Sequence, residues 1–197
     1  MTIALDIKGL SKTYGNGTLA VDNIDLQIES GGACALLGPN GAGKSTLIGM
    51  ISSLVNRSHG SIIINGFDLK TQTNKAKMQI GVMPQEYNLS HFENPLQILT
   101  QQAGFFGISY RKGRKKALEL LDQMQLLAHH KKQIRMLSGG MKRRLMLARA
   151  MVHSPKIIIL DEPTAGVDIE IREELWRILD HLHDQGLTVI LATHYLE

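Results

Sequence analysis

The stretch GPNGAGKST, residues 38–46, matches the pattern G-x-x-x-x-G-K-[ST] and decides the fold. It follows the apolar run ACALL (33–37), and KSTLIGMISSLV (44–55) spaces its apolar residues as a helix does. Glycines in such a loop let backbone N–H groups converge on phosphate oxygens, and the start of the following helix adds partial positive charge. The order strand, glycine loop and helix therefore predicts a phosphate-binding site.

Two carboxylates end a second apolar run further along the chain, KIIILDE at residues 156–162. An unpaired carboxylate at the end of a buried strand is costly, so Asp161 is expected to face a Mg²⁺ ion held through water. Side chains alternate along a strand, so Glu162 is expected to point elsewhere, toward an attacking water. Lys44 is predicted to neutralise the outer phosphates and Ser45 to offer a hydroxyl to Mg²⁺. Taken alone, the two carboxylates also fit a salt bridge.

A third motif, LSGGMKRRL at residues 137–145, lies between the first two. Ser138 is the expected N-cap of a helix, and Gly139 and Gly140 leave backbone N–H groups open to an anion. Because Lys44 already holds one set of phosphates, a second anion-binding helix end requires a second nucleotide. The alternative interpretation is an ordinary capped helix.

Together the three motifs resemble the nucleotide-binding subunit of an ATP-binding cassette (ABC) transporter, most closely the export-type ATPase subunits encoded separately from their membrane partner. The resemblance runs from Tyr14 to His194. It implies an α/β P-loop NTPase fold with a parallel core sheet, an N-terminal antiparallel β layer and a helical subdomain insert. It also implies ATP and Mg²⁺ as ligands, and a homodimer that sandwiches two ATP molecules head to tail, each Ser138 facing the γ-phosphate bound by the other subunit.

The apolar patterns predict elements that suit this fold. Alternation in IALDIKGL (3–10) and LAVDNIDLQI (19–28) predicts half-buried antiparallel strands. SIIING, QIGVMPQ, KIIIL and LTVILATH are predicted to be further strands, and helical patterns cover about 92–127, the segment after LSGG, and 170–185. Strands that alternate with helices indicate a parallel sheet with ligands at its carboxyl edge.

The whole chain, 1–197, is expected to be one ABC ATP-binding domain. Its ATPase core and β layer are expected at 1–85 and 156–197, and the helical subdomain with the signature at 86–155. Family members continue with further strands beyond the position of His194, so the C-terminal end of the domain is expected to be missing.

The resemblance assigns roles residue by residue. Glu162 and His194 are the catalytic residues. The nucleotide-binding residues are Tyr14, Val21, Gly38, Pro39, Asn40, Gly41, Ala42, Gly43, Lys44, Ser45 and Thr46. The metal shell consists of Ser45, Gln85 and Asp161; the signature facing the partner nucleotide consists of Leu137, Ser138, Gly139, Gly140 and Met141; and Asp168 belongs to the dimer loop.

Some of these residues have ordinary alternatives or depart from the family. Tyr14 is expected to stack on adenine, and it also fits a plain edge-strand tyrosine. Gln85 also fits a solvated polar residue, and a lone histidine such as His194 is more often structural. Met141 stands where the family most often has glutamine, and Asp168 lies in AGVD where SALD is more common.

Composition limits the remaining possibilities only weakly. The chain has 22 basic and 18 acidic residues, a formal charge of +4 that is compatible with a phosphate ligand, a nucleic acid or an anionic membrane. No run approaches the roughly 18 apolar residues of a membrane span. The basic clusters at 111–116 and 129–135 are predicted to be a solvated face, so no nucleic acid is expected. Cys34 is predicted to be a buried hydrophobe, and Arg143 and Arg144 to serve the helix surface.

The favoured function is an ATPase subunit that drives export through a separate integral membrane permease, located at the cytoplasmic face of the membrane. A soluble ABC ATPase acting on ribosomes or DNA is the alternative, although such members carry two cassettes or a long coiled coil. A kinase or GTPase would share the glycine loop but would not explain LSGG.

Overall fold

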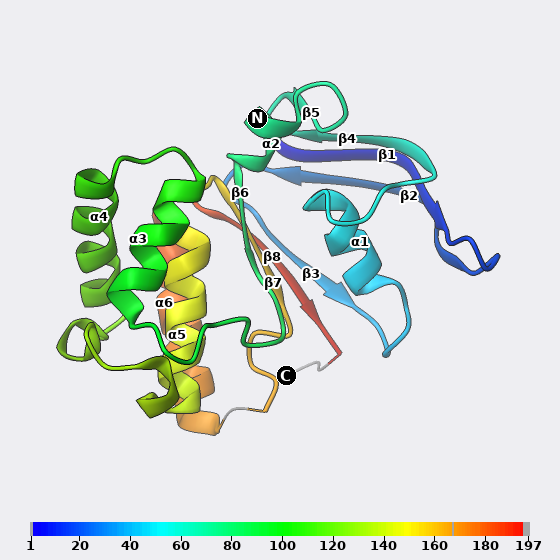
Figure 1. Cartoon of the computed structure of the whole chain (residues 1–197). Helices are drawn as coiled ribbons and strands as arrows, with labels where there is room; N and C mark the ends of the chain where they lie inside the picture. The colour runs from blue at the N-terminus through cyan, green and yellow to red at the C-terminus, as the bar shows by residue number, and fades with distance from the viewer. Residues whose placement is uncertain (1, 167, 195–197) are drawn as a thin grey trace.

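The computed structural model describes residues 2–166 and 168–194, and Figure 1 shows how their elements are arranged. The strands are β1 (Ile3–Thr13), β2 (Leu19–Glu29), β3 (Ala33–Leu37), β4 (His59–Ile64), β5 (Phe67–Asp68), β6 (Ile80–Met83), β7 (Ile157–Asp161) and β8 (Thr188–Thr193). The helices are α1 (Lys44–Ile51), α2 (Thr73–Lys77), α3 (Pro95–Phe105), α4 (Tyr110–Gln123), α5 (Gly139–Met151) and α6 (Ile169–Asp184), with 3-10 turns η1 (Leu127–His129) and η2 (Ile134–Met136).

The strands form two sheets. One has the order β3-β8-β7-β6 with every pair parallel, and the other has the order β2-β1-β4-β5 with every pair antiparallel. The predicted α/β fold, with a parallel core sheet and an antiparallel β layer, is therefore confirmed. Residues 157–160 of β7 are all fully buried between neighbouring strands, which explains their unbroken apolar run.

The parallel sheet separates two hydrophobic cores. Ile157 and Ile159 pack with α1 and the β layer, whereas Ile158 and Leu160 pack with helices α3 to α6. This alternation is the two-residue period of a strand. Figure 1 shows the four helices on one side of the parallel sheet and α1 with the antiparallel sheet on the other. The carboxyl edge of the sheet is thus supported from both sides.

Two helices differ from the sequence prediction. The helical segment expected over about 92–127 is two helices, α3 and α4, separated by a turn in which Gly107 takes a φ of 74°. Helix α1 ends at Ile51 instead of reaching residue 55, because the amides of Leu54 and Val55 both donate to the carbonyl oxygen of Gly49, at 2.8 and 2.9 Å.

Strand β3 lies at an edge of the parallel sheet and, among the described residues, pairs only with β8. Its residues alternate between exposed and half-buried, so Cys34 is half-buried and not fully buried as predicted. It packs against the core formed by α1 and the β layer. Burial raises the pKa of the Cys34 thiol and so disfavours the reactive thiolate.

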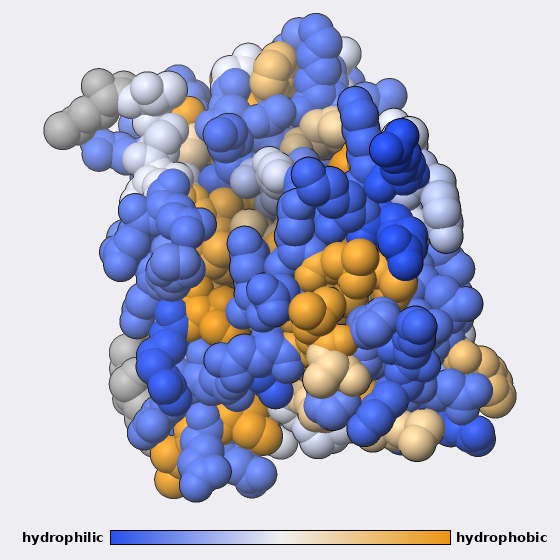
Figure 2. Space-filling model, turned by 90° about the vertical axis from the view of Figure 1, so that its left-hand side faces the viewer, coloured by the Kyte–Doolittle hydropathy of each residue, from blue (hydrophilic) through white to orange (hydrophobic). Residues whose placement is uncertain are grey.

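Figure 2 shows the face that carries α4, where hydrophilic residues surround patches of hydrophobic ones. Arg111, Lys112, Arg114 and Lys115 of the first basic cluster lie in α4 and are exposed, as a solvated face requires. Within residues 2–166 and 168–194, no helix has both the length and the hydropathy needed to cross a bilayer.

A buried histidine joins the end of α5 to β6. His153 stacks on Phe106 with ring centroids 3.6 Å apart, and its Nε2 donates to the carbonyl oxygen of Ile80 at 2.9 Å. Its Nδ1 is buried without a hydrogen-bond partner among the described residues, so a second ring proton there would be unsatisfied. Burial lowers the pKa of His153, and the nearby Lys116 lowers it further against the opposing effect of the Ile80 bond.

The depressed pKa of His153 predicts a pH-dependent stability. A group whose folded pKa is lowered contributes stability above its unfolded pKa, about 6.5 for histidine, and loses it as the pH falls toward the folded value. His153→Phe keeps an aromatic ring against Phe106 but does not titrate. Urea unfolding should therefore give a larger free energy of unfolding for wild type than for His153→Phe at pH 7.5, and a smaller difference between the two proteins at pH 5.5. A difference that is constant or larger at pH 5.5 would contradict this interpretation.

Candidate active site

Three groups of segments that carry predicted site residues meet at the carboxyl edge of the parallel sheet, around a cavity of about 220 Å³. The glycine loop forms one wall, the segment after β6 a second, and the ends of β7 and β8 the third. The lining residues are Ala20, Asn40, Gly41, Ala42, Gly43, Lys44, Ser45, Thr46, Gln85, Asp161, Glu162 and His194. Residues as far apart in the sequence as Ala20 and His194 are therefore brought to one place by the strand order.

The glycine loop takes a conformation that side chains would oppose. Gly41 and Gly43 have φ of 85° and 89°, in the left-handed region that favours glycine. A Cβ on Gly43 would also overlap the carbonyl oxygen of Ala20, whereas one on Gly41 would meet open space. Lys44 opens α1 and bends back, its Nζ donating to the carbonyl oxygens of Gly38 at 2.5 Å and Pro39 at 3.1 Å. An ammonium has three donors, so one remains for an anion in the cavity.

Asp161 supplies a half-buried carboxylate at the end of β7. Burial raises its pKa most strongly and Glu162 raises it further, while a hydrogen bond from Ser45 and the charge of Lys44 act in the opposite direction. Ser45, Gln85 and Asp161 bring a hydroxyl, an amide and a carboxylate to the same cavity. These are the hard oxygen donors that Mg²⁺ prefers, so the residues fit this ion.

Glu162 is a buried carboxylate, only 6% exposed, in a left-handed backbone conformation with φ 48°. Strand β7 ends at Asp161, and the amide of Glu162 donates to the carbonyl oxygen of Ala192 at 2.9 Å. The two carboxylates have different partners, because Asp161 accepts from Ser45 whereas Glu162 contacts residues that end and follow β8. Oε1 of Glu162 lies 2.7 Å from Nδ1 of His194, and Oε2 accepts from the hydroxyl of Thr193 at 3.3 Å.

The resemblance implies a catalytic role for His194, and in the structure its Nδ1 is hydrogen-bonded to Glu162. The pair is a carboxylate and an imidazole in direct contact, an arrangement that can orient a ring and share a proton. Both residues lie opposite the glycine loop in the same cavity.

Four predicted nucleotide-binding residues lie beside the cavity and do not line it: Tyr14, Val21, Gly38 and Pro39. The hydroxyl of Tyr14 is 3.4 Å from that of Thr46, and the ammonium of Lys12 lies 4.9 Å from the Tyr14 ring centroid. The Tyr14 side chain is therefore held next to the loop with its ring partly exposed. Val21 is buried and packs beneath Gly43.

The signature residues lie outside this cavity. Ser138 caps α5 as predicted, its Oγ accepting from the amide of Met141 at 3.2 Å. Leu137 is buried in the helical core and Met141 packs against it. Gly140 faces Ile171 of α6 so closely that a Cβ there would clash with the isoleucine side chain. Gly139 lies at the start of α5 and Asp168 at the exposed start of α6.

The prediction that both arginines serve the helix surface is wrong for Arg143, whereas Arg144 is half-buried. Arg143 is 3% exposed and donates to two backbone carbonyls, while Arg144 forms an ion pair with Glu174 at 2.9 Å. The sequence held a signal for Arg143, because it shares a helical stripe with Gly140 and Leu147, three positions before and four after it. Because the side chain of Arg143 is charged, its position on the apolar face of the helix was not recognised.

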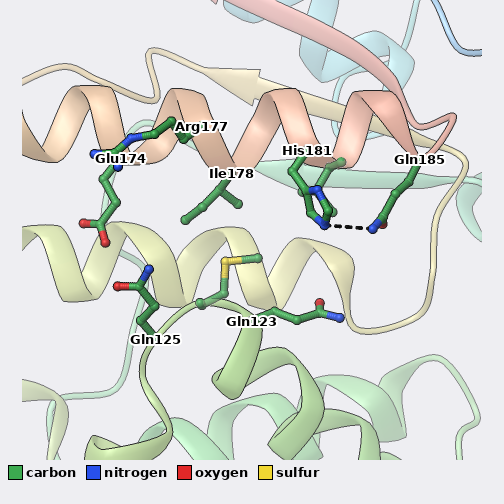
Figure 3. A pocket seen from close by; sticks show the side chains of 9 residues that line it. Gln123, Gln125, Glu174, Arg177, Ile178, His181 and Gln185 are labelled. Atoms are coloured by element: carbon green, nitrogen blue, oxygen red, sulfur yellow. Dashed lines mark hydrogen bonds between the residues drawn. The ribbon is translucent and has the colours of Figure 1, made fainter.

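A larger cavity of about 370 Å³ lies between the end of α4 and α6 (Figure 3). Gln123, Gln125, Glu174 and His181 are among its lining residues, and Nε2 of Gln185 and Nε2 of His181 are 2.9 Å apart there. None of the predicted site residues lines it. The chemistry of the glycine loop and the two carboxylates therefore favours the smaller cavity as the candidate active site.

The chain resembles known proteins in sequence and in fold. The model of the protein family described as "ABC transporter" matches residues 21–165. The chain is 38% identical over 193 residues to the linearmycin resistance ATP-binding protein LnrL of Bacillus subtilis, covering 98% of this chain and 62% of that protein. It is 36% identical over 197 residues to the Nod factor export ATP-binding protein I of Cupriavidus metallidurans, covering 100% of this chain and 65% of that protein.

Among solved structures, the chain matches an ATP-binding cassette in a dimeric post-hydrolysis state bound to ADP and phosphate. The TM-score is 0.86 with 29% sequence identity, and the match covers 97% of this chain and 88% of that one. The chain thus covers most of that cassette, whereas it spans less than two thirds of the length of the two relatives named above.

The two loop glycines allow a matched test of the loop geometry. Gly41→Ala should cost about 1–2 kcal/mol of unfolding free energy, because an alanine there is held in the left-handed region. Gly43→Ala should cost more, since the carbonyl of Ala20 must also move. Urea unfolding without nucleotide measures both losses, and equal losses would show that Gly43 does not contact β2 as described.

Proposed function

The chain belongs to the ABC transporter family, and from this premise we propose that it binds and hydrolyses ATP as a subunit of a membrane exporter. The observation that carries the proposal is the contact between Glu162 and His194, placed across one cavity from the glycine loop and Lys44. A structural salt bridge would not need a phosphate-binding loop opposite it.

The phosphates of ATP would occupy the cavity above the loop. Backbone amides of residues 41–46 and the remaining donor of Lys44 would bind the β- and γ-phosphate oxygens. The ring of Tyr14, steadied by Lys12 and Thr46, would stack on the adenine. Ser45, Gln85 and Asp161 would hold Mg²⁺, which when bound neutralises charge on the phosphates.

Glu162 would act as the general base. Its carboxylate is buried and fixed by Thr193 and His194, so it can accept a proton from a water molecule at a defined position. His194 would orient the carboxylate through Nδ1 and approach the γ-phosphate with the rest of its ring. Positioned groups of this kind work because their geometry is set before the substrate arrives.

A second copy of the chain would complete each site. The signature helix end at Ser138 and the loop at Asp168 lie outside the cavity of their own chain. An open helix N-terminus suits an anion, so the signature of one chain would face the γ-phosphate held by another, in a head-to-tail homodimer. The dimeric cassette with ADP and phosphate supports this arrangement.

A groove beside the active site would receive the membrane permease. A cavity of about 440 Å³ lies between β6 and the ends of α3 and α5, with Leu54, Pro84 and Phe106 in its lining. Pro84 adjoins Gln85, which lines the nucleotide cavity. Leu54, 81% exposed, adds an apolar rim of the kind that marks docking sites. The chain would then work at the cytoplasmic face of the membrane, and the resistance and export roles of the two relatives support export.

The proposed function also assigns the parts of the chain to two subdomains. Residues 1–85 and 156–197 would form the ATPase core with its β layer, and residues 86–155 the helical subdomain. The groove and Gln85 lie where these two parts meet.

Lys44→Ala tests nucleotide binding. Removing charge-assisted hydrogen bonds to the phosphates should weaken Mg·ATP affinity by roughly 10- to 100-fold, the equivalent of ~1.5–3 kcal/mol. Lys112→Ala, which removes an exposed lysine of α4, is the matched control and should bind as wild type does. Titration calorimetry measures all three proteins, and wild-type affinity in Lys44→Ala would rule out the assigned phosphate site.

Glu162→Gln tests the general base. The amide keeps the shape of the side chain but cannot take a proton, so kcat should fall by roughly 10²–10⁴-fold while Mg·ATP remains bound. Glu173→Gln, on the exposed side of α6, is the control for loss of a negative charge. Phosphate release at saturating Mg·ATP gives the rates. Normal turnover in Glu162→Gln would assign the base to another residue.

A further inference from the structure

We propose that Arg143 is a positioning residue that links the Gln85 segment, the segment after Glu162 and the signature, so that nucleotide-driven movement of one is passed to the others. The effect on turnover rests on the proposed ATPase function. The contacts that Arg143 makes between these segments are present in the chain itself, and hydrogen exchange measures their effect separately from turnover.

Arg143 reaches two segments from its place in α5. Its Nη1 donates to the carbonyl oxygen of Gln85 at 2.7 Å, and its Nη2 donates to that of Ala165 at 3.0 Å. The side chain of Gln85 lines the nucleotide cavity. The amide of Ala165 donates to the carbonyl oxygen of Glu162 at 3.2 Å, so this second segment begins at the proposed base. One guanidinium thus holds the backbone next to the metal shell and next to the base.

A third contact includes the signature. The guanidinium carbon of Arg143 lies 4.7 Å from the centroid of the Tyr87 ring, and the hydroxyl of Tyr87 donates to the carbonyl oxygen of Gly139 at 3.3 Å. Tyr87 is two residues after Gln85, and Gly139 follows Ser138. Gln85, Tyr87, Gly139 and Arg143 therefore form a closed ring of contacts between the nucleotide cavity and the surface that would face the partner.

This arrangement is a poor device for stabilising a fold. Arg143 is a cation that is 3% exposed, its hydrogen-bond acceptors are neutral carbonyls, and its Nε is buried with no partner among the described residues. Burying a charge and an unsatisfied donor is costly, and an apolar residue would fill the same space without that cost. The contacts instead join three segments that each carry a piece of the proposed site.

The geometry also requires arginine specifically. A guanidinium presents N–H groups that diverge in one plane, which lets two of them reach carbonyls on different segments while the face of the group packs on an aromatic ring. A lysine ammonium is a single point of charge on a flexible chain, and it cannot hold all three contacts at once. Arg143→Lys therefore keeps the positive charge but loses the simultaneous contacts with the two carbonyls and the aromatic ring.

The chain offers a control at the next residue. Arg144 has the same side chain and helix, but it pairs with Glu174, one of the residues lining the cavity in Figure 3, away from the active site. Arg144→Lys preserves that charge pair and removes the same guanidinium group from α5. Any general effect of replacing arginine by lysine in this helix appears in both variants.

The experiment measures hydrogen exchange and turnover in wild type, Arg143→Lys and Arg144→Lys. In wild type and Arg144→Lys, Mg·ATP is expected to slow exchange together in residues 84–88, 137–141 and 162–166. In Arg143→Lys the protection should remain at 84–88 and be lost in the other two segments. The kcat of Arg143→Lys should fall by roughly 10- to 100-fold, the factor for one hydrogen bond to a charged group, with KM within about twofold.

Three other results are decisive in different ways. If Arg143→Lys exchanges and turns over like wild type, the linkage does not exist. If it loses protection in all three segments, or unfolds at much lower urea than Arg144→Lys, Arg143 supports the fold and the proposal is wrong. If wild type shows the three-segment protection and Arg143→Lys loses it at 137–141 and 162–166, but wild type has no turnover, the ATPase function fails while the linkage through Arg143 stands.

Discussion

The backbone of Glu162 is the constraint on which the site depends. A buried, non-glycine residue with φ 48° costs roughly 1–3 kcal/mol and persists only where its surroundings hold it. Here the surroundings are the parallel register of β7 and β8, which brings the Glu162 amide to the carbonyl of Ala192 and the carboxylate to Thr193 and His194. The strained backbone conformation therefore comes with a carboxylate that is fixed beside an imidazole.

Helix α5 runs from this edge of the sheet toward the start of β6 at Ile80. Ser138 and Arg143 lie at its start, next to the active-site segments, and His153 follows its end, where Phe106 and Ile80 border the proposed permease groove. Both ends are held by buried polar groups that donate to backbone carbonyls. Such contacts have defined directions, so they can hold the helix in one position relative to β6 where apolar packing alone would allow it to slide.

The sequence predicted the parts of this structure that depend on local patterns. The apolar run of residues 157–160, the alternation in the first two strands and the glycine loop each indicate their element directly, and together they gave the layers and the carboxyl edge. The sequence could not indicate that, within residues 2–166 and 168–194, β3 pairs on one side only, because its apolar run is the same as that of a central strand. The helical spacing of Arg143 with Gly140 and Leu147 is a signal for its burial, but no local pattern indicates its partners. These are carbonyls of Gln85 and Ala165, in segments that meet α5 only in the folded chain.

The central claim is that each chain carries the phosphate loop of one ATP site and the signature of another, so that a single chain holds no complete site. The dependence of turnover on protein concentration tests this most directly, measured as phosphate release per chain at saturating Mg·ATP over a wide dilution series. The account predicts that turnover per chain rises with chain concentration and then levels off as the dimer becomes saturated. Turnover per chain that is appreciable and independent of concentration, in samples shown to be monomeric by light scattering, would contradict it.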